Sequence, residues 1–199
     1  MAKKKPAEPI KDEETVLDIQ DYLRYKSERN YTLFLVGITT GFRAGDLVKL
    51  RIRDLRRCIQ DGEIEILEEK KVNSRNIRKE NVKPRIVPIV DNLKKILKAY
   101  IKDKKDYEYA FPSRKGNHIT VAHVSRILRD AGEKFGLRNI TAHSMRKTYA
   151  YTLYIENDRD IVIVKEMLGQ SHIEITKRYL GLNKELYDKC SKKLNRLIR

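Results

Sequence analysis

Three residues near the end of the chain are of types that together could perform chemistry on a phosphodiester. His143 and Arg146 are three residues apart in the segment AHSMRKTYA, so a helix would place them on one face. Tyr179 follows in the segment LGQSHIEITKRYL, beyond two turn-like breaks. An imidazole, a guanidinium and a hydroxyl that converge from separate short helices could bind a phosphate and attack it. This stretch, Thr141 to Leu180, is the most specific part of the sequence.

The chemistry explains why these residue types are needed. A phosphodiester gains negative charge as it is attacked, and stabilising that charge usually contributes most to catalysis. A guanidinium suits this task because it is planar, permanently charged and bidentate, which makes Arg43 a second candidate beside Arg146. His143 could donate a hydrogen bond or accept the proton of the nucleophile. Tyrosine has a pKa of about 10, so Tyr179 would need nearby cations to deprotonate.

Each of these residues also has an ordinary explanation. His143 could be a structural histidine, and the His143–Arg146 pair could simply contact a phosphate backbone. Arg43 could be one of many surface arginines, and Tyr179 is one of 11 tyrosines. Only the order and the context of the residues single them out.

The charge of the chain favours an anionic polymer as partner. Lysine and arginine number 44 against 28 acidic residues, which gives a formal net charge of +16 and an isoelectric point of about 9.8. The alternative is a solvated basic surface. The sequence has no run of 18 apolar residues and no apolar segment behind the basic N-terminus, so it predicts neither a membrane span nor a secretory signal. Cys58 and Cys190 have no ligand-like spacing and predict reduced thiols in a cytosolic protein.

The elements that must position these residues are mostly helical. Apolar periodicity, caps and breakers predict helices from Glu13 onward, over Tyr31–Ile38, Gly45–Leu50 and Asp91–Ile101, from Thr120 to Gly136, over Thr141–Glu156 and Asp160–Leu168, from Ser171 to Tyr179, and over Asn183–Arg199. Residues 1–11 are rich in lysine and proline without periodicity, which predicts a disordered basic tail.

A short β segment interrupts the helices. Glu63–Leu67 and Pro84–Ile89 alternate with period two, and Asp61-Gly62 reads as a hairpin turn before the first of them. Residues 70–83 are polar and basic, and we interpret them as a long, mobile hairpin tip that either lies beside a duplex or is only solvated. The predicted fold class is therefore mainly α with a small antiparallel β-sheet, in one domain.

Four separated motifs in this order resemble the tyrosine recombinases, also called phage integrases. The motifs are TTGFRAGDLVKL, the basic hairpin, AHSMRKTYA and LGQSHIEITKRYL, and the resemblance covers the chain from about residue 12. The ending RYLGLN resembles integrases of mobile elements in Gram-positive bacteria. The resemblance implies the catalytic-domain fold of that family and site-specific cleavage and rejoining of double-stranded DNA without a cofactor. It also implies other protomers on the DNA, and a cytoplasmic, nucleoid-associated protein.

The resemblance assigns roles to the candidate residues. Tyr179 would be the nucleophile that forms a 3′-phosphotyrosyl link. Arg43 and Arg146 would clamp the scissile phosphate, and His143 would act as acid or base and as hydrogen-bond donor. Asp46, at the acidic position that follows the first arginine, would help to order the site.

The hairpin lysine of the family has two candidates. Lys71 in EEKKVNS matches the family position best, and Lys70 is the alternative, since strand alternation would let only one of them face the site. Lys70, Arg75 and Arg78 are expected to contact DNA.

The sequence departs from the family pattern in two places. Gln170 stands where a histidine is usual, nine residues before Tyr179, and His172 lies two residues later. Gln170 could still donate to a phosphate oxygen, or His172 could reach in, or activity could be reduced. The second departure is that residues 12–199 would form the catalytic domain without the usual N-terminal core-binding domain. These departures motivate an alternative function, a catalytically weakened DNA-binding module or regulator of a full-length integrase. A helix-turn-helix transcription factor would fit the charge but not the ordered motifs.

Overall fold

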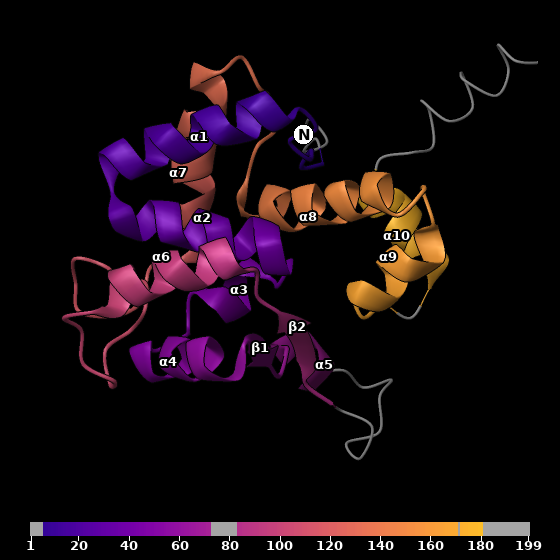
Figure 1. Cartoon of the computed structure of the whole chain (residues 1–199). Helices are drawn as coiled ribbons and strands as arrows, with labels where there is room; N and C mark the ends of the chain where they lie inside the picture. The colour runs from indigo at the N-terminus through magenta and orange to yellow at the C-terminus, as the bar shows by residue number, and fades with distance from the viewer. Residues whose placement is uncertain (1–5, 73–82, 171, 181–199) are drawn as a thin grey trace, which may run out of the picture. The chain divides into compact units, whose positions relative to one another are not determined.

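The computed structural model describes residues 6–72, 83–170 and 172–180 and confirms the predicted fold class. The described part contains α1 (Glu13–Lys26), α2 (Glu28–Thr40), α3 (Ala44–Leu47), α4 (Ile52–Asp61), β1 (Glu63–Ile66), α5 (Glu69–Val72), β2 (Arg85–Pro88), α6 (Asp91–Ile101), α7 (Val121–Lys134), α8 (Ala142–Glu156), α9 (Ile161–Met167) and α10 (Ile173–Leu180) (Figure 1). The chain divides into two compact units, residues 1–149 and 150–199, and the boundary falls within α8.

Side-chain caps determine where several of these helices begin. The carboxylate of Asp12 accepts from Thr15 N at 2.8 Å before α1, and the hydroxyl of Thr120 accepts from His123 N before α7. Asp160 caps α9 in the same way through Val162 N. The predicted helix starts at Glu13, after Thr120 and after Asp160 are therefore confirmed.

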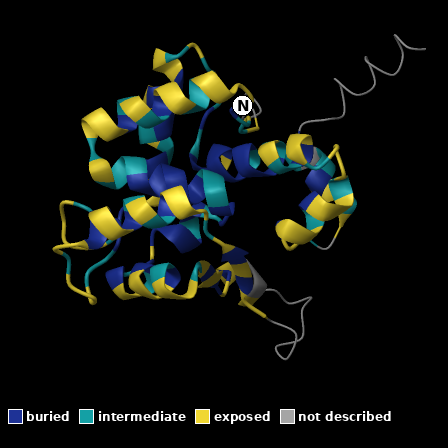
Figure 2. Ribbon diagram, viewed as in Figure 1, coloured by how far each residue is buried: buried dark blue, intermediate teal, exposed yellow. Residues whose placement is uncertain are grey.

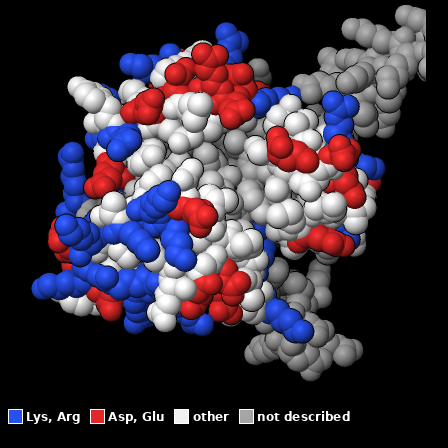
Figure 3. All heavy atoms as spheres, viewed as in Figure 1, with Lys and Arg blue, Asp and Glu red and all other residues white. Residues whose placement is uncertain are grey.

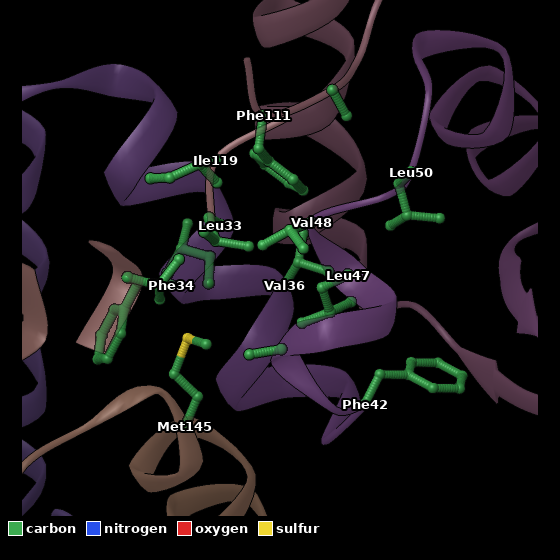
Figure 4. Close-up of a cluster of buried hydrophobic side chains, with 14 of the residues drawn as sticks. Leu33, Phe34, Val36, Phe42, Leu47, Val48, Leu50, Phe111, Ile119 and Met145 are labelled. Carbon is green, nitrogen blue, oxygen red and sulfur yellow. The ribbon is translucent and has the colours of Figure 1, made fainter. Parts of the chain in front are cut away.

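The core of the first unit is built around α2. This helix is buried along most of its length, whereas α1 and α6, which pack against it, are buried on one side only (Figure 2). Phe34 and Met145 lie close together in this core (Figure 4). A side chain at Gly37 would approach Met145 Sδ to 2.5 Å, so a glycine on α2 allows the first half of α8 to pack closely.

The small sheet has the predicted antiparallel pairing. β1 pairs with β2 in a register that sets Ile64 opposite Val87 and Ile66 opposite Arg85, and all four side chains are buried. The alternation of buried and exposed positions follows the period-two pattern of the sequence.

The hairpin turn predicted at Asp61-Gly62 is wrong. The residues before it form helix α4, because Ile52, Leu55 and Cys58 recur at helical spacing and are all buried. Gly62 has φ 77° and ends this helix, and its N–H donates to Cys58 O at 3.0 Å. A Gly after a helix and a Gly in a hairpin both need a positive φ, so the dipeptide alone did not distinguish them.

The disordered tail predicted for residues 1–11 does not extend to its last residues. Ile10 is buried, and its N–H donates to Thr148 Oγ1 at 2.9 Å. Glu8 N donates to Asn139 O at 3.2 Å. An apolar residue at position 10 therefore anchors this segment to the first unit, whereas residues 1–5 lie outside the described part of the chain.

The structure also describes one of the two cysteines and the lengths of the helices. Cys58 is a buried free cysteine, and burial raises the pKa of its thiol to about 11, while Cys190 lies outside the described residues. Among the helices that the structure describes, none is long and apolar enough to cross a membrane.

The second unit contains the end of α8 and the short helices α9 and α10, which pack on each other. Asp158 and Arg159 adopt φ values of 50° and 64°, so the predicted break between α8 and α9 is a tight turn. Val164, Leu168 and Leu180 are buried. Ser171 and the helix predicted over residues 183–199 lie outside the described residues.

Candidate active site

A tight turn after α2 positions Arg43. Gly41 adopts φ 62°, a conformation that favours glycine, and a Cβ at this position would lie 2.1 Å from Tyr149 Cδ1. Only glycine meets both requirements. The turn presents the carbonyl of Gly41 and brings Arg43 to the N-terminus of α3.

Arg146 reaches this turn from α8. Its side chain is 1% exposed, which is exceptional for a charged residue. Arg146 Nη1 donates to Gly41 O at 2.7 Å and to Glu68 Oε1 at 2.9 Å. These two bonds join α8 to the end of α2 and to the segment after β1.

Glu68 joins the two candidate arginines. Arg43 Nη1 lies 2.6 Å from Glu68 Oε1, the same oxygen that accepts from Arg146. The Glu68 side chain is 0% exposed, and that of Arg43 is 24% exposed. Two arginines from distant parts of the sequence thus meet on one buried carboxylate oxygen. The structure thus brings Arg43 and Arg146 together, and their role in binding a phosphate stays a prediction.

Sequence reasoning missed Glu68, although a signal was present. Ile64 and Ile66 point inward from β1, and Glu68 is the next residue in the same period-two series. A carboxylate at an expected core position needs a cationic partner, because a buried charge is costly unless it is paired. That requirement could have pointed to the arginines.

Asp46 supports the same segment from α3. It is buried, and its Oδ1 accepts from Glu69 N at 3.1 Å. Burial raises the pKa of Asp46, and the neighbouring Glu68 raises it further. Asp46 therefore fixes the backbone beside Glu68, and its role as a supporting residue of the site stays a prediction.

Arg85 is a third buried arginine, which sequence reasoning also missed. Its Nη2 donates to Thr40 O at 2.6 Å, and its guanidinium carbon lies 4.0 Å from the centre of the Phe42 ring. Burial, and then the charge of Arg146, lower the pKa of Arg85 to about 10. The side chain of Arg85 is also hydrogen-bonded to Tyr149, whose pKa is raised by burial. The sequence signal for Arg85 was its position in β2, where the period-two pattern places an arginine on the inward face.

His143 lies one helical turn before Arg146 and is exposed. Its backbone N–H donates to Thr141 Oγ1 at 3.3 Å in the first turn of α8. The helix therefore carries the imidazole and the buried guanidinium at the predicted three-residue spacing.

Helix α5 begins directly after Glu68 and carries Lys70 and Lys71. The argument from strand alternation does not apply to them, because the backbone here is helical and not extended. Arg75 and Arg78 lie outside the described residues.

The second unit carries Gln170, His172 and Tyr179. Gln170 Oε1 accepts from the hydroxyl of Thr176 at 2.6 Å, and Thr176 is fully buried on α10. Tyr179 is half-buried, three residues further along the same helix, and His172 is exposed. One hydrogen bond thus ties Gln170 to the helix of Tyr179.

A basic hollow of about 1040 Å³ lies elsewhere on the first unit, beside the N-terminus of α7. Five of the residues that line it are permanently basic: Lys26, Arg29, Arg114, Lys115 and Arg126. None of the described residues that line it is acidic. We refer to it below as the basic hollow.

The first unit therefore presents a buried paired-arginine cluster and a separate basic hollow, both suited to phosphates. A model of the phage integrase family matches residues 11–185. The chain belongs to the phage integrase family. The predicted family is thereby confirmed.

Two known proteins are similar to the chain in sequence, and one of them is also similar in length. The chain is 32% identical over 179 residues to the probable integrase/recombinase YoeC of Bacillus subtilis, and the match covers 89% of this chain and 91% of YoeC. It is 28% identical over 173 residues to the tyrosine recombinase XerD of Oceanobacillus iheyensis, covering 79% of this chain and 52% of XerD.

The fold also matches solved integrase-family structures. The crystal structure of the XerH site-specific recombinase bound to its difH substrate, a pre-cleavage complex, superposes with a TM-score of 0.65 at 21% identity. The match covers 96% of this chain and 55% of that one. The chain thus spans about half the length of these two Xer recombinases, and it has the fold of a tyrosine recombinase catalytic domain.

Proposed function

We propose that this protein is a site-specific DNA recombinase, or integrase, that cleaves and rejoins double-stranded DNA through a 3′-phosphotyrosyl intermediate. The observation that carries the proposal is the meeting of Arg43 and Arg146 on one buried carboxylate oxygen. Two guanidiniums held together in this way, in a member of the phage integrase family, make a site for the doubly charged transition state of phosphoryl transfer.

The cleavage step assigns one event to each candidate residue. The hydroxyl oxygen of Tyr179 attacks the scissile phosphorus, a bond forms between them, and the bond from phosphorus to the 5′ oxygen breaks. His143 accepts the phenolic proton, and Lys71, with Lys70 as the alternative, gives a proton to the leaving 5′ oxygen. The phosphotyrosine conserves the energy of the broken bond, so a new 5′ hydroxyl can rejoin the strand by the reverse reaction without a cofactor.

The remaining candidates support this step. Asp46 holds the backbone beside Glu68, and the amide of Gln170 donates to a phosphate oxygen. Lys70, Arg75 and Arg78 contact the DNA backbone. Residues 12–199 act as the catalytic domain, together with other protomers on the same DNA, in the cytoplasm and associated with the nucleoid.

Trapping of a covalent adduct tests the proposal. Labelled duplexes of randomised sequence, each with a nick, lose the short strand after cleavage, so a phosphotyrosyl product cannot be rejoined. The wild-type protein is expected to give a DNA adduct that survives detergent and heat. Tyr179→Phe is expected to give none, because a phenyl ring has no nucleophilic oxygen.

Tyr107→Phe is the control, since Tyr107 is exposed on the first unit and should not change the yield. Adduct formation that persists in Tyr179→Phe would rule out Tyr179 as the nucleophile.

Gln170 motivates a second candidate function, a DNA-binding module with weakened catalysis. Glutamine cannot carry charge or shuttle a proton as a histidine would. Such a module would bind the same duplexes with little or no adduct in the wild-type protein.

A further inference from the structure

Glu68 has no role in the reaction described above, yet it is the most buried charged group of the arginine cluster. Its carboxylate is 0% exposed, and one oxygen atom serves both Arg43 and Arg146. Within the part of the chain that the structure describes, Glu68 Oε2 is buried without a hydrogen-bond partner. A buried carboxylate with one bare oxygen is unfavourable unless strong cations compensate it, so the two ion pairs must account for its place here.

The cations of the cluster need a counter-charge in turn. Arg43 and Arg146 converge on one point, and Arg85 lies near enough for the charge of Arg146 to lower its pKa. Three positive side chains held together repel one another in a poorly solvated environment. Glu68 is the anion that directly contacts two of them, through Arg43 Nη1 at 2.6 Å and Arg146 Nη1 at 2.9 Å.

We propose that Glu68 is a resident counter-anion of the arginine cluster: it positions both guanidiniums when no phosphate is bound, and its charge weakens the binding of a phosphate to them. Glu68 is thus a positioning residue and does not touch the substrate. The inference rests on the proposed function, in which the same arginines bind the scissile phosphate. Its consequence is that removal of the charge destabilises the free protein and strengthens anion binding.

Glu68→Gln tests this consequence without DNA or cleavage. The variant keeps the shape of the side chain and an acceptor oxygen but removes the charge. Its melting temperature is measured at low salt while inorganic phosphate replaces chloride at constant ionic strength. A ligand that binds the folded state raises the melting temperature according to its affinity. We expect the variant to melt below the wild type in chloride and to bind phosphate about tenfold more tightly or more.

Two controls separate this effect from a change in net charge. Glu65→Gln also raises the net charge by one. Glu65 is exposed, and its 3.6 Å ion pair is with Arg57, which does not belong to the arginine cluster. Because such exposed pairs contribute little, this variant should respond like the wild type. In Glu68→Gln combined with Arg43→Met, the gain in phosphate affinity should disappear. A gain confined to the single Glu68 variant supports the proposal.

Other results would overturn it. If Glu68→Gln and the wild type bind phosphate equally well, the charge of Glu68 does not oppose anions. If chloride restores the lost stability as well as phosphate does, Glu68 has a purely structural role. If Glu68→Gln folds only in phosphate, the proposal is supported. If it folds in neither buffer, Glu68→Asp is measured instead, because aspartate withdraws the charge by one methylene. A phosphate affinity above that of the wild type then supports the proposal, and an unchanged affinity refutes it.

Since none of these measurements depends on a phosphotyrosyl product, a failure of the inference can be distinguished from a failure of the proposed function.

Discussion

Gln170 is the residue at which the chain departs most from the pattern of its family, and the structure defines what its amide can do. Its oxygen accepts from the buried hydroxyl of Thr176, so the acceptor end of the amide is occupied. The amino end can therefore donate to an anion, although it cannot transfer a proton. The role proposed for Gln170, a hydrogen bond donated to a phosphate oxygen, needs only this amino group.

Two substitutions at Gln170 and one control measure how far its amide fulfils the proposed role. Gln170→Glu keeps the acceptor for Thr176 but places an anionic oxygen where the donor was, so we expect adduct formation to fall about a hundredfold with duplex binding retained. Gln170→His supplies a donor again and should stay within about threefold of the wild type. Gln60→Glu, at an exposed position on α4, is the control and should have no effect. A large gain in Gln170→His would instead favour the weakened module.

At the scale of elements, helix starts were predictable because their causes are local. Asp12, Thr120 and Asp160 cap helices through their own neighbours in sequence. Period-two alternation likewise located β1 and β2. The prediction of a hairpin turn at Asp61-Gly62 was wrong because a helix end and a hairpin turn both require a glycine with positive φ.

The buried charges could not be predicted in the same way. Glu68 and Arg85 look like ordinary charged residues until β1, β2 and α8 are packed together, because their partners come from distant elements. Arg43 and Arg146 were candidates because guanidiniums suit a phosphodiester, and the family resemblance then assigned both to one phosphate. The sequence alone therefore supplied two cations of the cluster but neither the carboxylate between them nor the third guanidinium.

The turn at Gly41 gives a test at this scale. Gly41→Ala would require an alanine at φ 62° and would place its Cβ 2.1 Å from Tyr149 Cδ1. We expect the free energy of unfolding to fall by about 2–4 kcal/mol, from left-handed strain together with overpacking. Gly62→Ala is the matched control, because Gly62 has φ 77° but nothing within 4 Å of the added Cβ. It should lose only about 1 kcal/mol. Equal losses in denaturant titrations would mean that the contact with Tyr149 is unimportant.

For the whole molecule, the net charge of +16 is unevenly distributed. In the view of Figure 3, lysine and arginine gather over α6 and the loop that follows it, whereas acidic residues gather over α1. The basic hollow concentrates arginine and lysine beside the N-terminus of α7, whose backbone dipole also favours anions. Two basic regions on the first unit, α6 and the basic hollow, are therefore alternative candidates for the surface that contacts the DNA backbone.

The salt dependence of binding distinguishes these two regions. For about six phosphate contacts, affinity for a duplex should fall about a thousandfold between 50 and 200 mM salt. Because the concave basic hollow can surround a strand, we expect Arg114→Gln with Arg126→Gln to lower the slope of log affinity against log salt by about 2. Lys95→Gln with Lys98→Gln removes the same charge from exposed positions on α6 and should lower the slope by no more than about 0.5. Fluorescence anisotropy with a labelled duplex measures both slopes. If the slope decreases equally in the two double variants, neither region alone contacts the DNA backbone. An affinity that is independent of salt would refute the electrostatic argument altogether.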